Sequence, residues 1–290
     1  MTEGEAGGEL RHIVSLALAE DLDVAGDITS LAIFNPDDAG AARVVAREAC
    51  TVSGLAAAAE VCLQVDPGLS FLPLVADGGA APAGAEIVRL AGSVISILSA
   101  ERTLLNFLSR LSGIASLTAA FVKAAAGTSA RIAATRKTDP GLRLLEKQAV
   151  VHGGGESHRL GLYDALLIKD NHIAAAGGVA AAIARVRASL GADASLEVEV
   201  EDADQLRQAL AAGAQRILLD NMTPAEAAAA VAAVAGRAVV EASGGISLET
   251  VRLYAEAGVH VISAGALTRA AAGIDFSLEV TAGGSRDQSA

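Results

Sequence analysis

The sequence predicts an α/β protein in which a small strand-rich domain precedes an incomplete α/β barrel. From residue 131 onward, six short apolar runs are each followed by a helical segment, and this alternation is typical of a parallel sheet with right-handed crossovers. Polar residues stand at the end of every run. Such a distribution favours a barrel whose mouth carries the site over an open sheet, where polar residues gather at one switch point.

The composition is that of a globular protein. The 290 residues are 52% apolar and 19% charged, and they suffice for one large domain or two ordinary ones. A net charge of −12 without any basic run argues against nucleic acid or an anionic membrane as the main partner. The acidic N-terminus lacks a secretory pattern, and the most apolar run, 91–100, is about half a membrane span. We therefore expect a cytoplasmic location, with Cys50 and Cys62 reduced.

The first part of the chain alternates helices with short strands. Residues 1–8 are expected to be irregular. Helical spacing of apolar residues, or a high alanine content, predicts helices at 10–22, 55–65 and 99–117. β-branched residues, or apolar runs between Gly/Pro turns, predict strands within 42–54 and 69–98. We place a domain boundary after the third helix, which separates an N-terminal domain at 1–117 from a barrel domain at 118–290. Packing of the C-terminal tail back on the N-terminal domain is left open.

Six runs are the predicted barrel strands. They are RIAATRK (131–137), ALLIKDNH (165–172), LEVEVE (196–201), RILLDN (216–221), AVVEASGG (238–245) and VISAGAL (261–267). Asp139-Pro140 predicts an N-cap and first helical position after the first strand, and Thr223 to Glu226 predicts a capping box after the fourth.

Basic residues gather where the barrel begins. Residues 131–172 hold seven Lys/Arg, five acids and three of the five histidines, which gives this stretch a net charge of +2 in an acidic chain. Arg136-Lys137 ends the first strand, His158-Arg159 follows a triple glycine, and Lys169 ends the second strand. A structural salt bridge would explain one of these cations, but hardly all of them. The sequence therefore predicts a pocket for an anion, with His152 and His172 as ordinary structural histidines.

Carboxylates mark the third and fourth strands. Glu197, Glu199 and Glu201 alternate with valines, so they share one face of a strand. Glu197 and Glu201 lie either inside the barrel or at its solvated rim. Glu199 and Asp220, near strand ends, are the better functional pair, and their expected partner is Mg²⁺ bound to a phosphorylated substrate, or ribose hydroxyls.

Glycine-rich loops follow the last two strands. Ser243, Gly244 and Gly245 precede a helix predicted near Ser247, and backbone N–H groups there can hold a phosphate. Gly265, after the last strand, offers the second half of this cradle. A lone Gly-Gly is usually only a turn, but two such loops in succession favour phosphate binding. Neither a Ser-His-Asp arrangement nor a Cys nucleophile is evident, so the residues indicate an enzyme for a substrate that bears carboxylates and phosphates.

The ordered motifs resemble those of the quinolinate phosphoribosyltransferase family. They are LALAEDLDVAGDITS, AERTLLNFLSRLSGIAS, TRKTDPGLRLLEKQAVVHGGG, SHRLGL, LIKDNH, EVEVE, LLDNM, EASGGI, ISAGALT and DFSLEV. The resemblance implies an N-terminal α/β sandwich-like domain and a C-terminal incomplete TIM-like α/β barrel of six to seven strands. It also implies a homodimer in which one subunit's N-terminal part covers the partner's barrel mouth. A higher oligomer remains open.

The resemblance also implies roles for particular residues. Arg102 would bind quinolinate in the neighbouring subunit's site. The residues that would line the site for carboxylates and phosphates are Arg136, Lys137, His158, Arg159 and Lys169. Glu199 and Asp220 would serve the ribose and Mg²⁺, and the residues that would hold phosphate are Ser243, Gly244, Gly245 and Gly265. The expected catalytic residues are Lys137, Lys169, Glu199 and Asp220. The chain departs from the commonest bacterial pattern at Ala134, Ser157 and Arg269.

The implied reaction is Mg²⁺-dependent transfer of phosphoribosyl from phosphoribosyl pyrophosphate to quinolinate with decarboxylation. It yields nicotinate mononucleotide, pyrophosphate and CO₂ in de novo NAD biosynthesis. One alternative is a phosphoribosyltransferase-like paralogue associated with molybdenum transport, against which the intact LIKDNH argues. Another is a barrel aldolase with Lys169 as the Schiff-base lysine, and a third is a non-catalytic binding protein.

Overall fold

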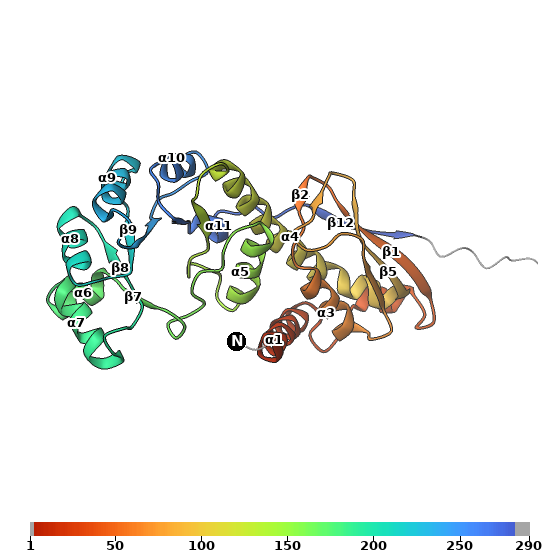
Figure 1. Ribbon diagram of the computed structural model, residues 1–290. Helices are drawn as coiled ribbons and strands as arrows, with labels where there is room; N and C mark the ends of the chain where they lie inside the picture. Colours follow the sequence, from red (N-terminus) through yellow and green to blue (C-terminus); the bar gives the residue numbers. More distant parts are fainter. Residues whose placement is uncertain (1–2, 282–290) are drawn as a thin grey trace, which may run out of the picture. The chain divides into compact units, whose positions relative to one another are not determined.

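The computed structural model describes residues 3–281, which form two compact units. The first unit comprises the chain up to Leu117, the segment Pro140–Gly153 and the residues from Ala271 onward; the second comprises Thr118–Asp139 and Gly154–Ala270. Helix α4 (Val94–Ala125) contributes to both units. Figure 1 follows the chain through them. The domain boundary placed after residue 117 stays a prediction.

An antiparallel sheet forms the first unit's framework. Its strand order is β12 (Phe276–Thr281), β1 (Ala39–Ala46), β5 (Glu86–Ser93) and β3 (Ser70–Pro73), and β2 (Cys50–Thr51) pairs separately with β4 (Ala80–Ala81). Because β12 pairs with β1, the last described strand joins the first unit.

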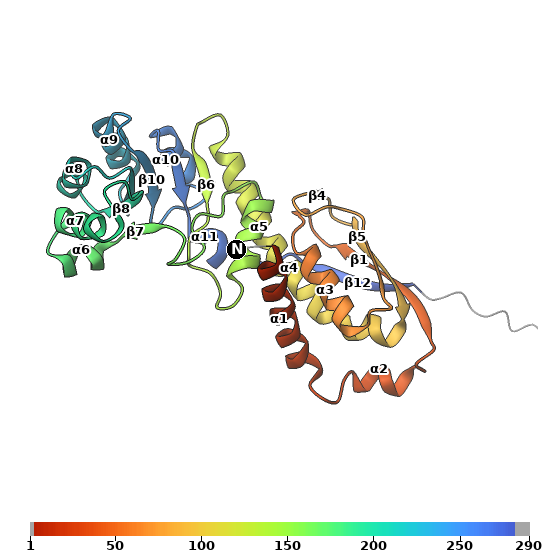
Figure 2. The same cartoon turned by 60° about the horizontal axis from the view of Figure 1, so that its bottom comes forward.

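Helices of the first unit include α1 (Glu3–Leu22), α2 (Ile28–Ile33), α3 (Leu55–Val65) and α5 (Arg143–His152). Figure 2 shows α3 beside α4, and Gly54, directly before α3, approaches the side chain of Leu111 on α4 closely. The bounds of α3 agree with the prediction. The irregular start was predicted wrongly for residues 3–8, which belong to α1.

Helix α4 begins earlier and ends later than predicted. Residues 94–98, predicted as strand, are its first turns, because a short apolar run does not by itself distinguish a strand from a buried helix. By length and composition α4 could cross a membrane, but 56% of its most apolar stretch is buried within the protein. That burial is typical of a core helix. Cys50 and Cys62 are buried and free, and burial raises the pKa of the Cys62 thiol to about 12.

The second unit is built on a six-stranded parallel sheet. The strand order is β6 (Arg131–Ala133), β11 (Val261–Ser263), β10 (Val239–Ser243), β9 (Arg216–Asp220), β8 (Leu196–Val200) and β7 (Leu166–Ile168). Each of the six predicted runs contains one of these strands, but the strands are shorter than the runs. Residues 170–172 belong to the helix Asp170–Ala176, and residues 266–267 belong to the helix Ala266–Arg269. Beside the edge strand β6, the Glu156 N–H donates to the Ile132 carbonyl at 2.8 Å, and the Glu156 carbonyl accepts from the Ala134 N–H at 2.8 Å. This single parallel bridge places a short extended segment beside β6, outside the six-stranded sheet.

Helices follow the strands of the second unit. They are α6 (Asp170–Ala176), α7 (Val179–Leu190), α8 (Ala203–Ala211), α9 (Pro224–Val234), α10 (Val251–Glu256) and α11 (Ala266–Arg269). In Figure 1, α8, α9 and α10 lie on the outer side of the strands. The valines of β8 are fully buried, and Glu197 and Glu199, which alternate with them, are also below one tenth exposed. Both faces of this strand are therefore covered.

Local cap predictions had mixed outcomes. The Thr223 capping box is present, with both reciprocal hydrogen bonds to Glu226. The cap predicted at Asp139 is wrong: α5 begins at Arg143, because Gly141, with a φ of 81°, first turns the chain. The helix predicted near Ser247 begins at Val251.

Candidate active site

A polar pocket of about 480 Å³ lies at the carboxyl ends of the parallel strands, and all six strands or the loops that follow them contribute to its lining. It brings together ten of the predicted site residues, namely Arg136, Lys137, His158, Arg159, Lys169, Glu199, Asp220, Ser243, Gly244 and Gly245. Arg102 does not line it. That side chain is exposed on α4 within the first unit.

Lys137 is held by the loop after β6 and by α11. Its N–H donates to Thr135 Oγ1 at 3.1 Å, and its carbonyl accepts from Thr268 Oγ1 at 2.7 Å. Gly265 stands directly beside the lysine side chain, since an added Cβ would lie 3.0 Å from Lys137 Cδ and 3.2 Å from Arg269 Nη2. Gly265 therefore leaves room for these two cationic side chains next to the pocket.

Two guanidinium groups lie near each other in the pocket. Arg136 Nε is buried without a hydrogen-bond partner in the described chain. Arg159 donates through Nη1 to the Ala165 carbonyl at 3.4 Å, and burial, followed by the charge of Arg136, lowers its pKa. Two guanidinium groups that lie close together, one of them with an unpaired N–H donor, form a site where a bound anion would offset the repulsion and accept the free hydrogen bond.

Lys169 and Glu199 form an ion pair at the ends of β7 and β8. Lys169 Nζ lies 2.9 Å from Glu199 Oε2, and the lysine side chain is 42% exposed whereas that of the glutamate is 9% exposed. The Lys169 N–H donates to His172 Nδ1 at 3.0 Å, which fixes the start of α6. His172 thus has a structural role, as His152 has through Ser53 Oγ at 2.8 Å in the first unit.

The loops after β9 and β10 fit against each other. Asp220 Oδ2 accepts from Asn221 Nδ2 at 2.7 Å, and the Asn221 N–H donates to the Ser243 carbonyl at 2.9 Å. Gly244 has a φ of 94°, and an added Cβ would lie 2.8 Å from the Asn221 nitrogen. Glycine is therefore required at 244 by packing as well as by conformation. Gly245, with a φ of 62°, has open space around it.

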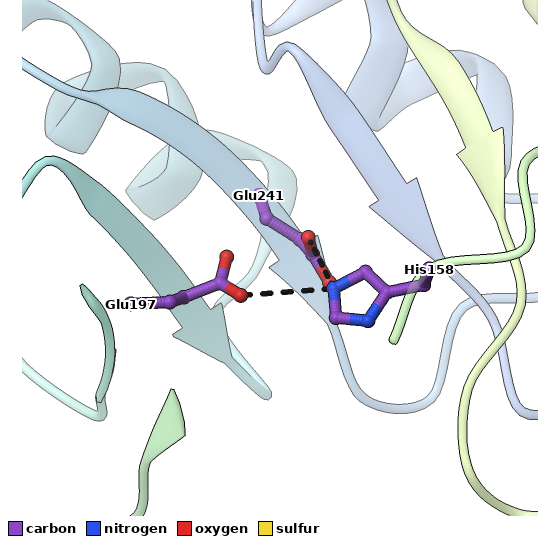
Figure 3. A group of neighbouring side chains, drawn as sticks. All are labelled: His158, Glu197 and Glu241. Carbon is purple, nitrogen blue, oxygen red and sulfur yellow. Dashed lines mark hydrogen bonds and ion pairs between the residues drawn. The ribbon is translucent and has the colours of Figure 1, made fainter. Parts of the chain in front are cut away.

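His158 enters the barrel from the segment that follows Glu156 (Figure 3). Its Nε2 lies 3.2 Å from Glu241 Oε2 and 3.6 Å from Glu197 Oε2. Hydrogen bonding to Glu197 and then to Glu241 raises the pKa of His158 to about 9, although burial opposes this. Burial acts to raise the pKa of Glu241, yet the hydrogen bond and charge of His158 lower it.

The sequence did not assign Glu241 or Arg216 to the site. Arg216 Nε lies 3.4 Å from Glu197 Oε1, and its Nη2 lies 3.4 Å from Glu241 Oε2. The rim alternative is wrong for Glu197, which is 5% exposed, and right for Glu201, which is exposed. A lone glutamate inside the apolar run AVVEAS was the signal for Glu241, since a buried carboxylate needs a cationic partner.

A parallel α/β barrel with a pocket of basic side chains at the carboxyl ends of its strands defines a class of enzyme that acts on polyanionic substrates. The chain belongs to the quinolinate phosphoribosyl transferase family. The model of the family's C-terminal domain matches residues 114–279, and that of its N-terminal domain matches residues 27–112.

Relatives match over nearly their whole length. A probable nicotinate-nucleotide pyrophosphorylase (carboxylating) of Bacillus subtilis is 39% identical over 94% of each chain. The chloroplastic nicotinate-nucleotide pyrophosphorylase (carboxylating) of Arabidopsis thaliana is 40% identical over 94% of this chain and 83% of its own. The solved nicotinate-nucleotide pyrophosphorylase of Francisella tularensis superposes with a TM-score of 0.90 at 40% identity, covering 94% of this chain and 96% of that one.

Proposed function

We infer that this protein acts as a quinolinate phosphoribosyltransferase in NAD biosynthesis. It transfers the phosphoribosyl group of phosphoribosyl pyrophosphate to the ring nitrogen of quinolinate, and decarboxylation then gives nicotinate mononucleotide, pyrophosphate and CO₂. Beyond family membership, one observation carries this inference. The pocket holds Arg136 and Arg159 near each other, with the Arg136 Nε donor unused, as binding of a dicarboxylate or a phosphate requires.

We propose that the basic residues bind the negative groups, while Glu199 and Asp220 face the ribose. As pyrophosphate leaves, positive charge develops on the sugar ring, and nearby carboxylates stabilise it. The pyridine nitrogen, held in line through the carboxylates of its ring, then forms the bond to ribose C1. The positive charge of the quaternary ring nitrogen stabilises the electron pair that CO₂ leaves on the adjacent ring carbon, and a proton from solvent then takes the place of CO₂. No covalent enzyme intermediate is needed. Lys137 and Lys169 are the proposed cations at the departing phosphates.

Mg²⁺ is the proposed cofactor. Glu199 and Asp220 both line the pocket and offer the carboxylate oxygens that Mg²⁺ prefers. One oxygen of each carboxylate is already engaged, Glu199 Oε2 by Lys169 and Asp220 Oδ2 by Asn221. The residues therefore fit an ion held by the remaining carboxylate oxygens together with substrate oxygens. When bound, Mg²⁺ would neutralise charge on the pyrophosphate.

We further propose a homodimer in which Arg102 of each subunit reaches the partner's site. An exposed arginine on α4 that does not line the pocket of its own second unit is compatible with this role. A cytoplasmic location is the accompanying proposal.

Complementation tests the reaction and the shared site together. Wild type is incubated with quinolinate, phosphoribosyl pyrophosphate and Mg²⁺, and CO₂ and nicotinate mononucleotide are followed. Arg102→Ala and Lys137→Ala are each expected to be nearly inactive. An equal mixture regains part of the activity, because each mixed dimer contains one site with neither substitution. Lack of any recovery would exclude the shared site, whereas inert wild type that still binds phosphoribosyl pyrophosphate would favour the molybdenum-associated paralogue.

The aldolase alternative has less support. Lys169 is paired with Glu199 and 42% exposed, whereas a Schiff-base lysine is activated by desolvation or by a neighbouring cation. Borohydride in the presence of a carbonyl substrate is expected to leave Lys169 unmodified.

A further inference from the structure

Four charged side chains from four segments meet inside the second unit. They are Glu197 of β8, Arg216 of β9, Glu241 of β10 and His158, and we call them the barrel-floor cluster. Arg216 contacts both carboxylates at 3.4 Å, and His158 Nε2 lies within 3.6 Å of both. Two carboxylates are balanced by one guanidinium and one imidazolium, so the cluster is electrically neutral when His158 is protonated.

The cluster separates two cavities. His158 and Glu241 line the pocket at the carboxyl ends of the strands. A second cavity of about 340 Å³ is lined by His158, Glu197 and Arg216. Its other walls include the first residues of several strands, Arg131, Leu166 and Val261 among them, so it lies at the amino ends. His158 therefore forms part of the floor of the active-site pocket.

The backbone directs His158 to this position. Its φ of 52° lies in the left-handed region, which residues other than glycine seldom adopt and which persists only where the surroundings enforce it. Two residues earlier, the backbone N–H and the carbonyl of Glu156 are both hydrogen-bonded to the neighbouring chain, at Ile132 and Ala134. Figure 3 shows both carboxylates on the Nε2 side of the ring. Within the described residues, no hydrogen bond engages Nδ1.

We propose that Glu241 and Glu197 are positioning residues that hold the His158 ring as a fixed cation, with Nδ1–H presented to a carboxylate of the substrate. This proposal rests on the proposed function. Arg216 neutralises the second carboxylate, so that the pair does not repel the anionic substrate. Burial of a charge is tolerable only when it is paired in this way.

A metal ion is the competing explanation, because His158, Glu197 and Glu241 present ligand atoms within 4.8 Å of one another. Arg216 argues against it, since a guanidinium already contacts both carboxylates. At the amino ends, the other charged groups around His158 are its neighbour Arg159 and the ion pair of Arg131 with Glu156. At the carboxyl ends, the charged residues that line the same pocket as His158 are Arg136, Lys137, Arg159, Lys169, Asp170, Glu199 and Asp220.

The test compares Glu241→Gln with Glu241→Asp and Glu197→Gln. The control is Glu201→Gln, which alters an exposed glutamate directly after β8, the strand that carries Glu197. NMR of ¹⁵N-histidine, assigned with His158→Gln, measures the charge of the ring. Steady-state kinetics measure KM for each substrate and kcat between pH 6 and 9. Thermal unfolding and phosphoribosyl pyrophosphate binding verify folding of each variant.

We expect His158 to be an imidazolium in wild type at pH 8 and neutral in Glu241→Gln. The KM for quinolinate then rises about tenfold or more at pH 8, as loss of a charged hydrogen bond implies, with a smaller change in kcat. Lowering the pH to 6 recovers much of the loss, because the ring is protonated there without Glu241. Glu197→Gln gives a similar effect, Glu241→Asp retains part of the function, and Glu201→Gln resembles wild type.

Three results would overturn the proposal. A neutral His158 in wild type at pH 8 is sufficient by itself, even if no variant folds. Equal effects on both substrates without recovery at pH 6 would indicate a purely structural role. Stoichiometric metal in purified wild type that Glu241→Gln lacks would establish the metal site instead. If wild type does not convert quinolinate, the proposed function fails, while the NMR result still decides the state of the cluster.

Discussion

Lys169 Nζ lies 2.9 Å from Glu199 Oε2, and both side chains face the polar pocket. The cation directly after β7 and a carboxylate of β8 therefore neutralise each other at adjacent strand ends. In the proposed function, a substrate that carries both phosphate and ribose hydroxyls would offer each partner a new contact.

Lys169→Ala is predicted to impair turnover without unfolding the protein. The side chain is 42% exposed, and α6 is fixed by the backbone N–H of Lys169 instead. Loss of a hydrogen bond to a charged group costs about 1.5–3 kcal/mol, so kcat/KM should fall by roughly ten- to a hundredfold. Steady-state kinetics measure this, with the exposed Lys123→Ala as control. Unchanged kcat/KM would remove Lys169 from the site.

Glycine substitutions distinguish the phosphate loop from an ordinary turn. Gly245 and Gly236 have φ values of 62° and 76°, and each has open space where a Cβ would stand. Alanine at either position should cost a similar free energy of unfolding, about 1–2 kcal/mol. Only Gly245→Ala should also weaken binding of phosphoribosyl pyrophosphate, measured by calorimetry, because it changes the direction of N–H groups in the pocket. Equal binding by both variants would contradict the cradle.

Removal of divalent cations tests the cofactor proposal. EDTA should abolish turnover and excess Mg²⁺ should restore it. Asp220→Asn should raise the Mg²⁺ concentration for half-maximal activity by about tenfold, since an amide oxygen replaces a charged ligand. Asp193→Asn, an exposed substitution on the loop before β8, serves as control. Full wild-type activity after exhaustive chelation would exclude a metal-dependent reaction.

The sequence predicted the strands and the residues at their ends better than it predicted how deeply each side chain is buried. Alternation placed Glu197 and Glu201 on one face of β8, but their burial depends on what faces them. His158 and Arg216 meet Glu197 inside the barrel, whereas Glu201 lies past the end of the strand. His158 reaches that position only through a left-handed φ of 52°, which no residue pattern announces. The cap predicted at Asp139 failed for a different reason: Pro140-Gly141 is itself a turn signal, and the helix begins only after this turn.

Stability should depend on pH through the His158 ring. Its pKa is raised from 6.5 to about 9 by Glu197 and Glu241. The imidazole ring of His158 therefore binds its proton more tightly in the folded than in the unfolded chain. Its stabilisation is fully present below about pH 6.5 and is lost as the pH rises to about 9. The side chain is 13% exposed, so the loss could reach about 3 kcal/mol at most.

Urea unfolding of wild type and His158→Gln between pH 6 and 9.5 measures this loss, with the exposed His12→Gln as control. Between pH 6.5 and 9, wild type and His12→Gln should lose more stability than His158→Gln, whatever the absolute difference between the proteins. On the acid side the pH dependence of the stability has the opposite sign. The lowered pKa of Glu241 contributes stability that is present above about pH 4.5 and lost as the pH falls below it. Parallel profiles for all three proteins above pH 6.5 would mean that His158 is not held as a cation.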